Sequence, residues 1–435
     1  MNERKTRYII LAGGIIVVIA LAFGTFYRRD NPEVASVAYA SLLNRTQIWD
    51  TQCVDTMKTS RDKARIWSNR PDLRNHIEME MAAAETIGAN CVAIDTSYDP
   101  EFLPYLKAWV AGARNHKLAV WFRGNFSSWE GWFGYPRTMT LDEHIQKTAE
   151  FIRSNPNLFT DGDIFTPAPE AENGGPFYPM DSSKLDTYAS FLKSEDTVVG
   201  NVFGGINKKV TVNWFSMNGE LAKQLFTEDI VNDLGGVVTL DHYIKEPQEM
   251  GAYIKYFHDL YKARVVVGEF GAPIPQINGT MSEEEQAEFI GRVLHELYEN
   301  HSIVSAVNYW DLYDGPTALL NQDGSLRSVA HVLQSYFIPA QVSGRVIDTL
   351  GNPLNNIEVR SQDGANSIRT DKEGRYVLLL PAGSNDMVIT GDMYKSLSQH
   401  IQVASHDKIE KNITLEPQLA TPFYWVAYHL RNIIK

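Results

Sequence analysis

The chain has 435 residues, a formal net charge of −13 at pH 7 and two cysteines. This acidity argues against nucleic acid as a partner, because proteins that bind phosphate backbones concentrate basic side chains on one surface. Two cysteines are too few for a disulfide scaffold. Cys53 and Cys91 both fall in apolar runs that suit buried strands, so we expect core thiols rather than a bridge. Metal-ligand spacing is absent from the sequence, so we expect no metal and no cofactor.

The chain opens with an apolar segment. Its residues from Tyr8 to Tyr27 carry no charge, and basic residues flank them on both sides. About 20 apolar residues span the hydrocarbon core of a bilayer as a helix. A cleaved signal peptide is the alternative, although its apolar region is usually shorter. We predict that residues 1–34 comprise a short cytoplasmic stub, an uncleaved transmembrane helix and a linker. The rest of the protein would then be membrane-anchored and extracellular or periplasmic.

Strand and helix signals alternate over residues 35–338. Short apolar runs suit strands buried on both faces, and a segment with helical period follows each of them. The predicted strands are Thr51–Met57, Cys91–Asp95, Leu118–Phe122, Asp163–Thr166, Val210–Trp214, Val237–Leu240, Val265–Phe270 and Ile303–Trp310. Eight such units predict an α/β fold with the sheet closed into a (β/α)₈ TIM barrel. A doubly wound open sheet is the alternative, but no glycine-rich loop follows the first strand.

Beyond Pro339 the apolar pattern changes from helical to alternating. Short predicted strands are separated by turns such as Gly351-Asn352-Pro353, which indicates a small all-β sandwich over residues 340–417. The last segment, 418–435, mixes aromatic and basic residues, as an interfacial helix on a membrane does. A helix docked on the barrel is the alternative for this tail.

Glutamates follow two of the predicted strands. Glu269 ends the seventh strand, and Gly268 leaves space beside it. Glu170 and Glu172 follow the fourth strand. The C-terminal tips of barrel strands face the active site. Two carboxyl groups across one rim suit glycosidic cleavage, in which one attacks the sugar and the other protonates the leaving oxygen.

Other polar and aromatic residues gather at the remaining strand ends. Arg123 can keep a nearby carboxylate ionised through a charge-assisted hydrogen bond, or it can form a purely structural ion pair. Indole and phenol rings can stack on sugar rings, although a tryptophan at a strand end can also simply fill the barrel mouth. The predicted substrate-binding residues are Arg123, Trp129, Trp132, Glu172, Asn213, His242, Tyr243 and Trp310.

These motifs resemble those of the clan A glycoside hydrolases, the cellulase-like retaining (β/α)₈ enzymes, from about Ala40 to Phe337. The resemblance implies that Glu269, in Gly-Glu-Phe-Gly, is the nucleophile. It also implies sugar contacts by His242 and Tyr243 and a subsite floor at Trp310.

The acid/base position departs from the clan pattern. The clan usually has Asn-Glu-Pro there, whereas this chain has Pro169-Glu170-Ala171. Glu170 aligns best, and Glu172 is the reserve. Asn173 or Asn213 can replace the missing amide.

Residues 340–417 resemble a carboxypeptidase regulatory-like domain, through stretches such as Thr370-Asp371-Lys372-Glu373-Gly374. The resemblance implies an exported protein and a module without catalytic residues. The sequence as a whole favours a membrane-anchored retaining glycoside hydrolase acting on an oligo- or polysaccharide. A catalytically inactive glycan-binding barrel and a transglycosylase that remodels cell-surface glycans are the alternatives.

Overall fold

The computed structural model of the protein describes residue 39 and residues 42–418. The predicted anchor at residues 1–34 lies outside this part of the chain, as does the predicted tail except for its first residue. Within the described residues, no helix is both long enough and apolar enough to cross a bilayer.

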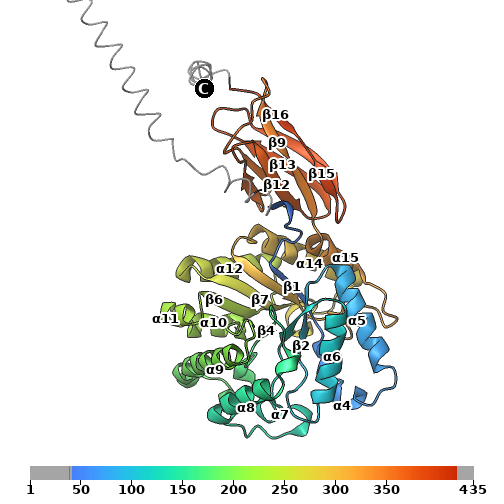
Figure 1. Ribbon diagram of the computed structural model, residues 1–435, viewed down its shortest axis with the longest axis vertical. Coiled ribbons are helices and arrows are strands. Elements are labelled where there is room, and N and C mark those ends of the chain that lie inside the picture. Colours follow the sequence, from blue (N-terminus) through green and yellow to red (C-terminus); the bar gives the residue numbers. More distant parts are fainter. Residues whose placement is uncertain (1–38, 40–41, 419–435) are drawn as a thin grey trace, which may run out of the picture.

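An eight-stranded parallel sheet surrounded by helices forms the larger part of the molecule (Figure 1). Its strands are β1 Thr51–Asp55, β2 Cys91–Ile94, β3 Ala119–Phe122, β4 Ile164–Phe165, β5 Ser216–Met217, β6 Val237–Asp241, β7 Arg264–Phe270 and β8 Val304–Tyr309. They are ordered β4-β3-β2-β1-β8-β7-β6-β5. Ile164 also forms a parallel bridge with Thr211, just before β5, so the two edges of the curled sheet meet. The predicted barrel is therefore present as a barrel-like parallel sheet.

Helices connect successive strands, as the helical periods predict. The longer ones are α5 Leu73–Ile87, α6 Leu103–Asn115, α8 Leu141–Ser154, α9 Leu185–Gly205, α12 Pro247–Tyr261, α14 Glu283–Glu299 and α15 Ser328–Phe337. Shorter ones are α3 Met57–Ser60, α4 Ala64–Trp67, α7 Ser127–Glu130, α10 Gly219–Leu225, α11 Glu228–Asp233 and α13 Pro275–Asn278. Local sequence sets some of these boundaries: Ser282 and Glu285 form a reciprocal capping box that starts α14.

The fifth strand differs from the prediction, which covered Val210–Trp214. The backbone of Thr211 pairs with the β4 segment through Asp163 and Phe165, and pairing with β6 begins only at Ser216. The strand is thus divided between its two neighbours as the sheet curls. The apolar run marks its first half, which does not reach the C-terminal edge of the sheet.

The two cysteines correct a second expectation. Cys53 of β1 and Cys91 of β2 lie directly opposite each other in the parallel register, with their Cα atoms 4.4 Å apart, and they form a disulfide. The prediction of free core thiols is wrong. Burial in neighbouring strands was read correctly, but the sequence did not reveal that the register places the two residues side by side.

A small β domain follows the barrel, as predicted. One sheet has the order β11-β10-β13-β14, and the other has the order β12-β9-β15 with β16 also paired to β9. The strands are β9 Ala340–Asp348, β10 Glu358–Ser361, β11 Ser367–Arg369, β12 Arg375–Leu380, β13 Gly383–Thr390, β14 Leu397–Val403, β15 Lys408–Glu410 and β16 Ile413–Leu415.

This β domain packs on the pole of the barrel where the parallel strands begin (Figure 1). The hydroxyl of Tyr298, at the end of α14, donates to the Leu379 carbonyl at 2.9 Å. The Gln341 amide donates to the Leu43 carbonyl, ahead of β1, at 3.0 Å. The opposite pole, where the strands end, is left clear of the β domain.

Candidate active site

Inward-facing side chains fill the barrel in two layers. Along a strand, residues two apart share a face, so Cys53 and Asp55 both point inward from β1 at different heights. We define the lower layer by its apolar members Cys53, Cys91, Ala93, Trp121, Ile164, Trp214, Val266 and Ala306. We define the upper layer by Asp55, Asp95, Arg123, Asp241, Glu269 and Asn308, which are all at least 95% buried. The C-terminal end of the barrel therefore holds an unusual concentration of buried charge.

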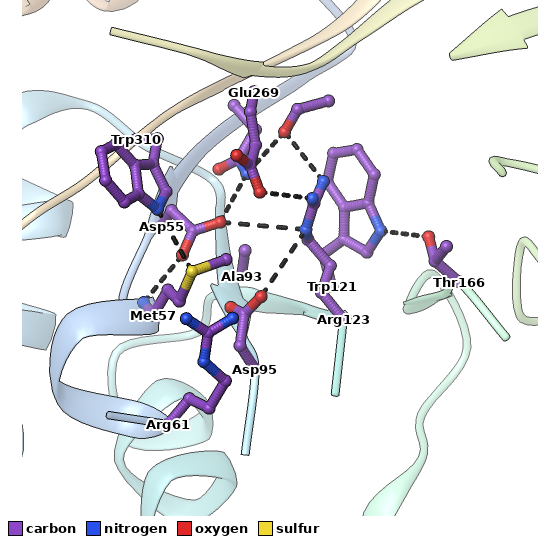
Figure 2. Close-up of polar contacts among 12 residues, drawn as sticks. Asp55, Met57, Arg61, Ala93, Asp95, Trp121, Arg123, Thr166, Glu269 and Trp310 are labelled. Carbon is purple, nitrogen blue, oxygen red and sulfur yellow. Dashed lines mark hydrogen bonds and ion pairs between the residues drawn. The ribbon is translucent and has the colours of Figure 1, made fainter. Parts of the chain in front are cut away.

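Arg123 lies at the centre of the upper layer. Its Nη2 donates to Oδ2 of Asp241 at 2.8 Å and to Oε1 of Glu269 at 2.5 Å. Its Nη1 donates to the Gly268 carbonyl at 2.9 Å. Figure 2 shows Asp55 and Asp95 on the side of its Nε, at 3.9 and 3.8 Å. One guanidinium thus compensates several buried carboxylates, which would otherwise repel one another.

Glu269 is held at both carboxylate oxygens. Oε1 accepts from Arg123, and Oε2 accepts from the Tyr243 hydroxyl at 2.6 Å. The glycine before it is required by space, because a Cβ on Gly268 would lie 2.4 Å from Oδ1 of Asp241. Burial raises the pKa of Glu269 to about 8, and the positive charge of Arg123 opposes that rise. The hydrogen bonds from Arg123 and Tyr243 fix this carboxyl group in one orientation.

A cavity of about 260 Å³ opens above this layer. Its lining residues are Met57, Arg61, Asp95, Arg123, Glu130, Gly131, Trp132, Arg137, Pro169, Glu170, Asn173 and Glu269. Glu170 and Glu269 therefore face the same space, one from the loop after β4 and the other from β7. A cavity of this kind, with convergent polar groups and one aromatic ring, is the expected form of a ligand site.

Glu170 is held in a strained backbone conformation. Its φ of 44° lies in the left-handed region, which non-glycine residues adopt infrequently. Its amide donates to the Ser216 carbonyl at 3.0 Å, and Asn173 Nδ2 donates to its Oε2 at 3.1 Å. Burial raises the pKa of Glu170 well above its usual value, and the charge of Glu269 adds to the rise. Both effects favour the protonated form of this carboxyl group.

Glu172, the alternative acid/base, has a different environment. Its Oε2 accepts from the Tyr188 hydroxyl at 2.7 Å, and its Oε1 accepts from the backbone and side chain of Asn218 at 3.3 Å. It is 5% exposed and does not line the cavity. Its contacts join the loop after β4 to the segment after β5, so the geometry favours Glu170 as the carboxyl group available to a ligand.

The two tryptophans of the loop after β3 have different positions. Trp132 lines the cavity, as expected of a sugar contact. Trp129 is fully buried and stacks on Phe191, with ring centroids 5.3 Å apart. The expectation that Trp129 contacts a sugar is wrong, because its ring forms part of the core below the loop. A Cβ on Gly174 would lie 2.2 Å from this ring, which shows how closely the loop after β4 packs on it.

Trp310 and His242 lie next to the site but do not line the cavity. Trp310 makes an edge-to-face contact with the Tyr243 ring at 5.8 Å, and its Nε1 donates to Sδ of Met57 at 3.4 Å. His242 packs on Tyr253, with ring centroids 3.9 Å apart, and burial lowers the pKa of His242 to about 4. Its imidazole is therefore neutral at pH 7, and its contacts are those of a supporting residue.

Asn213 lies at the other pole of the barrel. Its Nδ2 donates to the Leu234 carbonyl at 2.8 Å, in the connection that precedes β6. The expectation of a substrate contact is wrong, because the fifth strand ends later than predicted. Asn173 instead supplies the amide beside Glu170, which was the other expected possibility.

Several charged site residues were not singled out from the sequence. Asp55 and Asp95 could have been, because each stands two positions beyond an inward-facing residue of the lower layer at the end of its strand. Arg61 and Arg137 come from loops, and Glu130 ends the four-residue helix α7, so no periodicity indicates the direction of these side chains. The described residues contain no group of three or more His, Cys, Asp or Glu side chains arranged to hold a metal ion.

Comparisons with known proteins give a family match and several similar solved structures. Residues 341–416 match the carboxypeptidase regulatory-like domain family. No curated protein matches the chain. Solved structures also match the chain, at low identity.

An FMN-binding β-glucuronidase from Facaelibacterium prausnitzii L2-6 is 12% identical to this chain, with a TM-score of 0.42. The match covers 76% of this chain and 53% of the β-glucuronidase, so this chain spans about half the length of that protein. A fungal β-1,4-galactanase is 12% identical with a TM-score of 0.49, over 66% of this chain and 99% of the other. XacCel5A in complex with cellopentaose is 11% identical with a TM-score of 0.45, over 67% and 100% of the two chains. At identities this low, the activity of these proteins cannot be assigned to this chain. The family match thus concerns residues 341–416, and the likeness to these solved structures concerns the fold alone.

Proposed function

We propose that the protein is a retaining glycoside hydrolase that cleaves O-glycosidic bonds of an oligo- or polysaccharide by double displacement. The observation that carries this proposal is the pair Glu170 and Glu269, which line one cavity at the C-terminal end of the barrel. Two donors, one of them a cation, fix Glu269, whereas burial and the charge of Glu269 raise the pKa of Glu170 well above its usual value. Such a difference between paired carboxyl groups is what acid and nucleophile roles require.

Glu269 acts as the nucleophile in this scheme. Its carboxylate attacks the anomeric carbon, and the glycosidic oxygen leaves as Glu170 protonates it. Arg123 and Tyr243 each donate to one oxygen of Glu269, so its attack geometry is set before the sugar arrives. Arg123 also favours the ionised form that attack needs.

Glu170 acts as the acid and then as the base. After it has given its proton to the leaving group, its carboxylate removes a proton from water, which attacks the glycosyl–enzyme ester and releases Glu269. Asn173 donates to Glu170 and orients it. Trp132 is the ring on which a sugar can stack, and Tyr243 and Trp310 border the same end of the barrel.

Export fits the same proposal. The uncharged run from Tyr8 to Tyr27 would anchor the chain in a membrane, with the barrel on the outer side. The Cys53–Cys91 disulfide supports an oxidising compartment, since such bonds rarely persist in the cytosol.

The test compares wild-type protein with Glu269→Gln, which keeps the shape of the side chain but removes the nucleophile. Glu288→Gln, an exposed glutamate on α14, is the matched control. On a panel of aryl glycosides and polysaccharides, we expect Glu269→Gln to lose activity by a factor on the order of 10⁴. Equal turnover by the two proteins would remove Glu269 from the mechanism. Proton NMR of the first-formed product should show the anomer of the substrate.

One observation favours a second candidate, a glycan-binding barrel without catalysis. Pro169, which lines the cavity, occupies the position before Glu170 where the clan usually has asparagine. If wild-type protein binds an oligosaccharide without turning it over, this second candidate replaces the first.

A further inference from the structure

Two arginines in the cavity wall have no part in the scheme above. Arg61 follows α3, and Arg137 precedes α8. Both line the cavity together with Trp132 and the carboxyl pair. Arg123 is occupied by upper-layer carboxylates, so these two guanidinium groups are the cavity's other sources of positive charge.

Arg137 is positioned but not neutralised. Its guanidinium stacks on the Tyr178 ring, 4.2 Å from the centroid. The side chain passes over Gly131, where a Cβ would lie 3.2 Å from Cζ. Among the described residues, no carboxylate lies within 4.0 Å of this guanidinium. An arginine held by a ring and a glycine, and left without an anion, is ready to bind one.

Arg61 brings a second positive charge to the same wall. Its guanidinium lies 4.8 Å from the centre of the Trp132 ring, and its Nη2 pairs with Asp62 at 2.8 Å. The pairing with Asp62 uses one edge of the guanidinium, and Arg61 still lines the cavity. Trp132 therefore has a guanidinium on its face, and Arg137 lies in the same loop.

Glu130, two residues before Trp132, also lines the cavity, and its surroundings limit its negative charge. It is 7% exposed, and its Oε1 accepts from Nδ2 of Asn125 at 2.7 Å. The orientation of Asn125 is fixed in turn by His144, whose Nε2 lies 2.8 Å from its Oδ1. Burial raises the pKa of Glu130 to about 8, and the charges of Arg61 and Arg137 oppose that rise, so at pH 7 this group offsets the charge of Arg137 only in part.

We propose that the sugar bound at Trp132 carries an anionic group and that Arg137, assisted by Arg61, binds it. A hexuronic acid is the substrate class that fits best, because a planar carboxylate can accept two parallel hydrogen bonds from a guanidinium. A sulfate or phosphate ester on a neutral sugar presents related chemistry. This inference rests on the proposed glycosidase function and assigns its substrate class.

Binding is measured with the full-length Glu269→Gln protein, so that turnover does not consume the ligand. Calorimetric titrations use hexuronate oligomers, the same oligomers after carboxyl reduction, and sulfated or phosphorylated neutral oligomers. We expect the hexuronate oligomer to bind at least about tenfold more tightly than its reduced counterpart. Preference for a sulfated or phosphorylated oligomer would assign the anion to an ester and overturn the hexuronate assignment.

Two further substitutions in the same background locate the anion. Arg137→Gln should remove the preference for the charged oligomer and leave affinity for the reduced one within about twofold. Arg153→Gln, an exposed arginine on α8 away from the cavity, is the matched control and should keep the preference. Equal loss for both oligomers in Arg137→Gln, or no preference in its parent, would overturn the proposal. Unchanged melting temperatures show that the variants are folded.

Turnover by wild-type protein separates this inference from the one on which it rests. If charged oligomers bind through Arg137 but are not cleaved, the result supports the anion site and contradicts the proposed hydrolase function. If reduced and charged oligomers are cleaved at the same rate, and Arg137→Gln does not change that rate, the result supports the hydrolase function and contradicts the anion site. Absence of binding by every oligomer of the panel counts against the anion site.

Discussion

The two layers inside the barrel are built on the same strands and have opposite chemistry. In the lower layer, buried apolar side chains and a disulfide fill the space. Two residues further along β1, β2 and β3, the side chains are Asp55, Asp95 and Arg123. Burying these charges costs free energy that the lower layer must offset. The lower layer thus supplies stability, and the upper layer supplies chemistry.

The largest effect is expected from Arg123→Gln. Removing the guanidinium leaves Asp241 and Glu269 buried without their shared cation, so we expect a loss of about 3–5 kcal/mol in unfolding free energy. Activity should be lost as well. Arg114→Gln is the control, because Arg114 pairs with Asp163 at the start of β4 and is partly exposed. Urea unfolding and kcat/KM check both variants, and an active, stable Arg123→Gln protein would contradict the division.

The double variant Cys53→Ala/Cys91→Ala probes the lower layer. The disulfide closes a loop with a sequence separation of 38 residues, for which chain entropy predicts a contribution of about 4 kcal/mol to stability. We expect unfolding at lower urea concentration but an unchanged pH dependence of kcat/KM in the folded protein. A shifted pH dependence would mean that the layers are coupled. Mass spectrometry after thiol alkylation of native protein should find no free thiol.

Stability should fall as pH rises from about 5 to 9. The pKa values of Glu269 and Glu130 are raised by burial from 4.5 to about 8. The folded state therefore holds protons that the unfolded state releases above pH 4.5, and stability present below that pH is lost as pH rises through 8. Melting temperatures across this range check the direction. Glu130→Gln should flatten the slope, and a protein most stable at pH 9 would contradict the assignment.

The pH dependence of activity sharpens the roles in the upper layer. Glu269 must be ionised to attack, so kcat/KM should rise with pH up to about 8, and it should fall where Glu170 loses its proton. The Tyr243 hydroxyl lowers the pKa of Glu269 by donating to it. Tyr243→Phe should therefore move the acid limb to higher pH. An acid limb that stays in place would remove Tyr243 from this role.

The smallest effect is expected at the junction with the β domain. Tyr298→Phe removes the hydrogen bond to the Leu379 carbonyl, which should cost about 1 kcal/mol of stability. Because this contact lies at the opposite pole from the cavity, kcat and KM should remain those of wild-type protein. A change in either constant would show that the β domain influences the site.

The sequence predicted the fold well because each strand signal was local. Buried apolar runs and helical periods identified all eight units, and the largest displacement was at the fifth strand. There the run Val210–Trp214 marks the half that pairs with the β4 segment, while β5 itself is Ser216–Met217. That division depends on how the sheet closes, which no local pattern records. Asn213 was misplaced for the same reason.

Sequence patterns indicate the direction of a side chain at strand ends and not in loops, although the loop residue Glu170 was predicted from the motif it resembles. Glu269 and Arg123 come from strand ends, and the structure brings them into contact. Trp129 and Trp132 share one short loop, yet one ring is in the core and the other is in the cavity. Their spacing in the sequence carries no information about this difference. The disulfide was missed because the relative register of neighbouring strands is a property of the assembled sheet.

The position of the β domain has a consequence for how such a molecule can be attached. The described chain enters the barrel near Leu43 and leaves it after Phe337, and both points lie on the pole that carries the β domain. A tether or an additional module joined at either point would be attached at the pole opposite the cavity. Such an attachment can therefore be lengthened or exchanged without blocking access of a long polymer to the cavity at the C-terminal end of the strands.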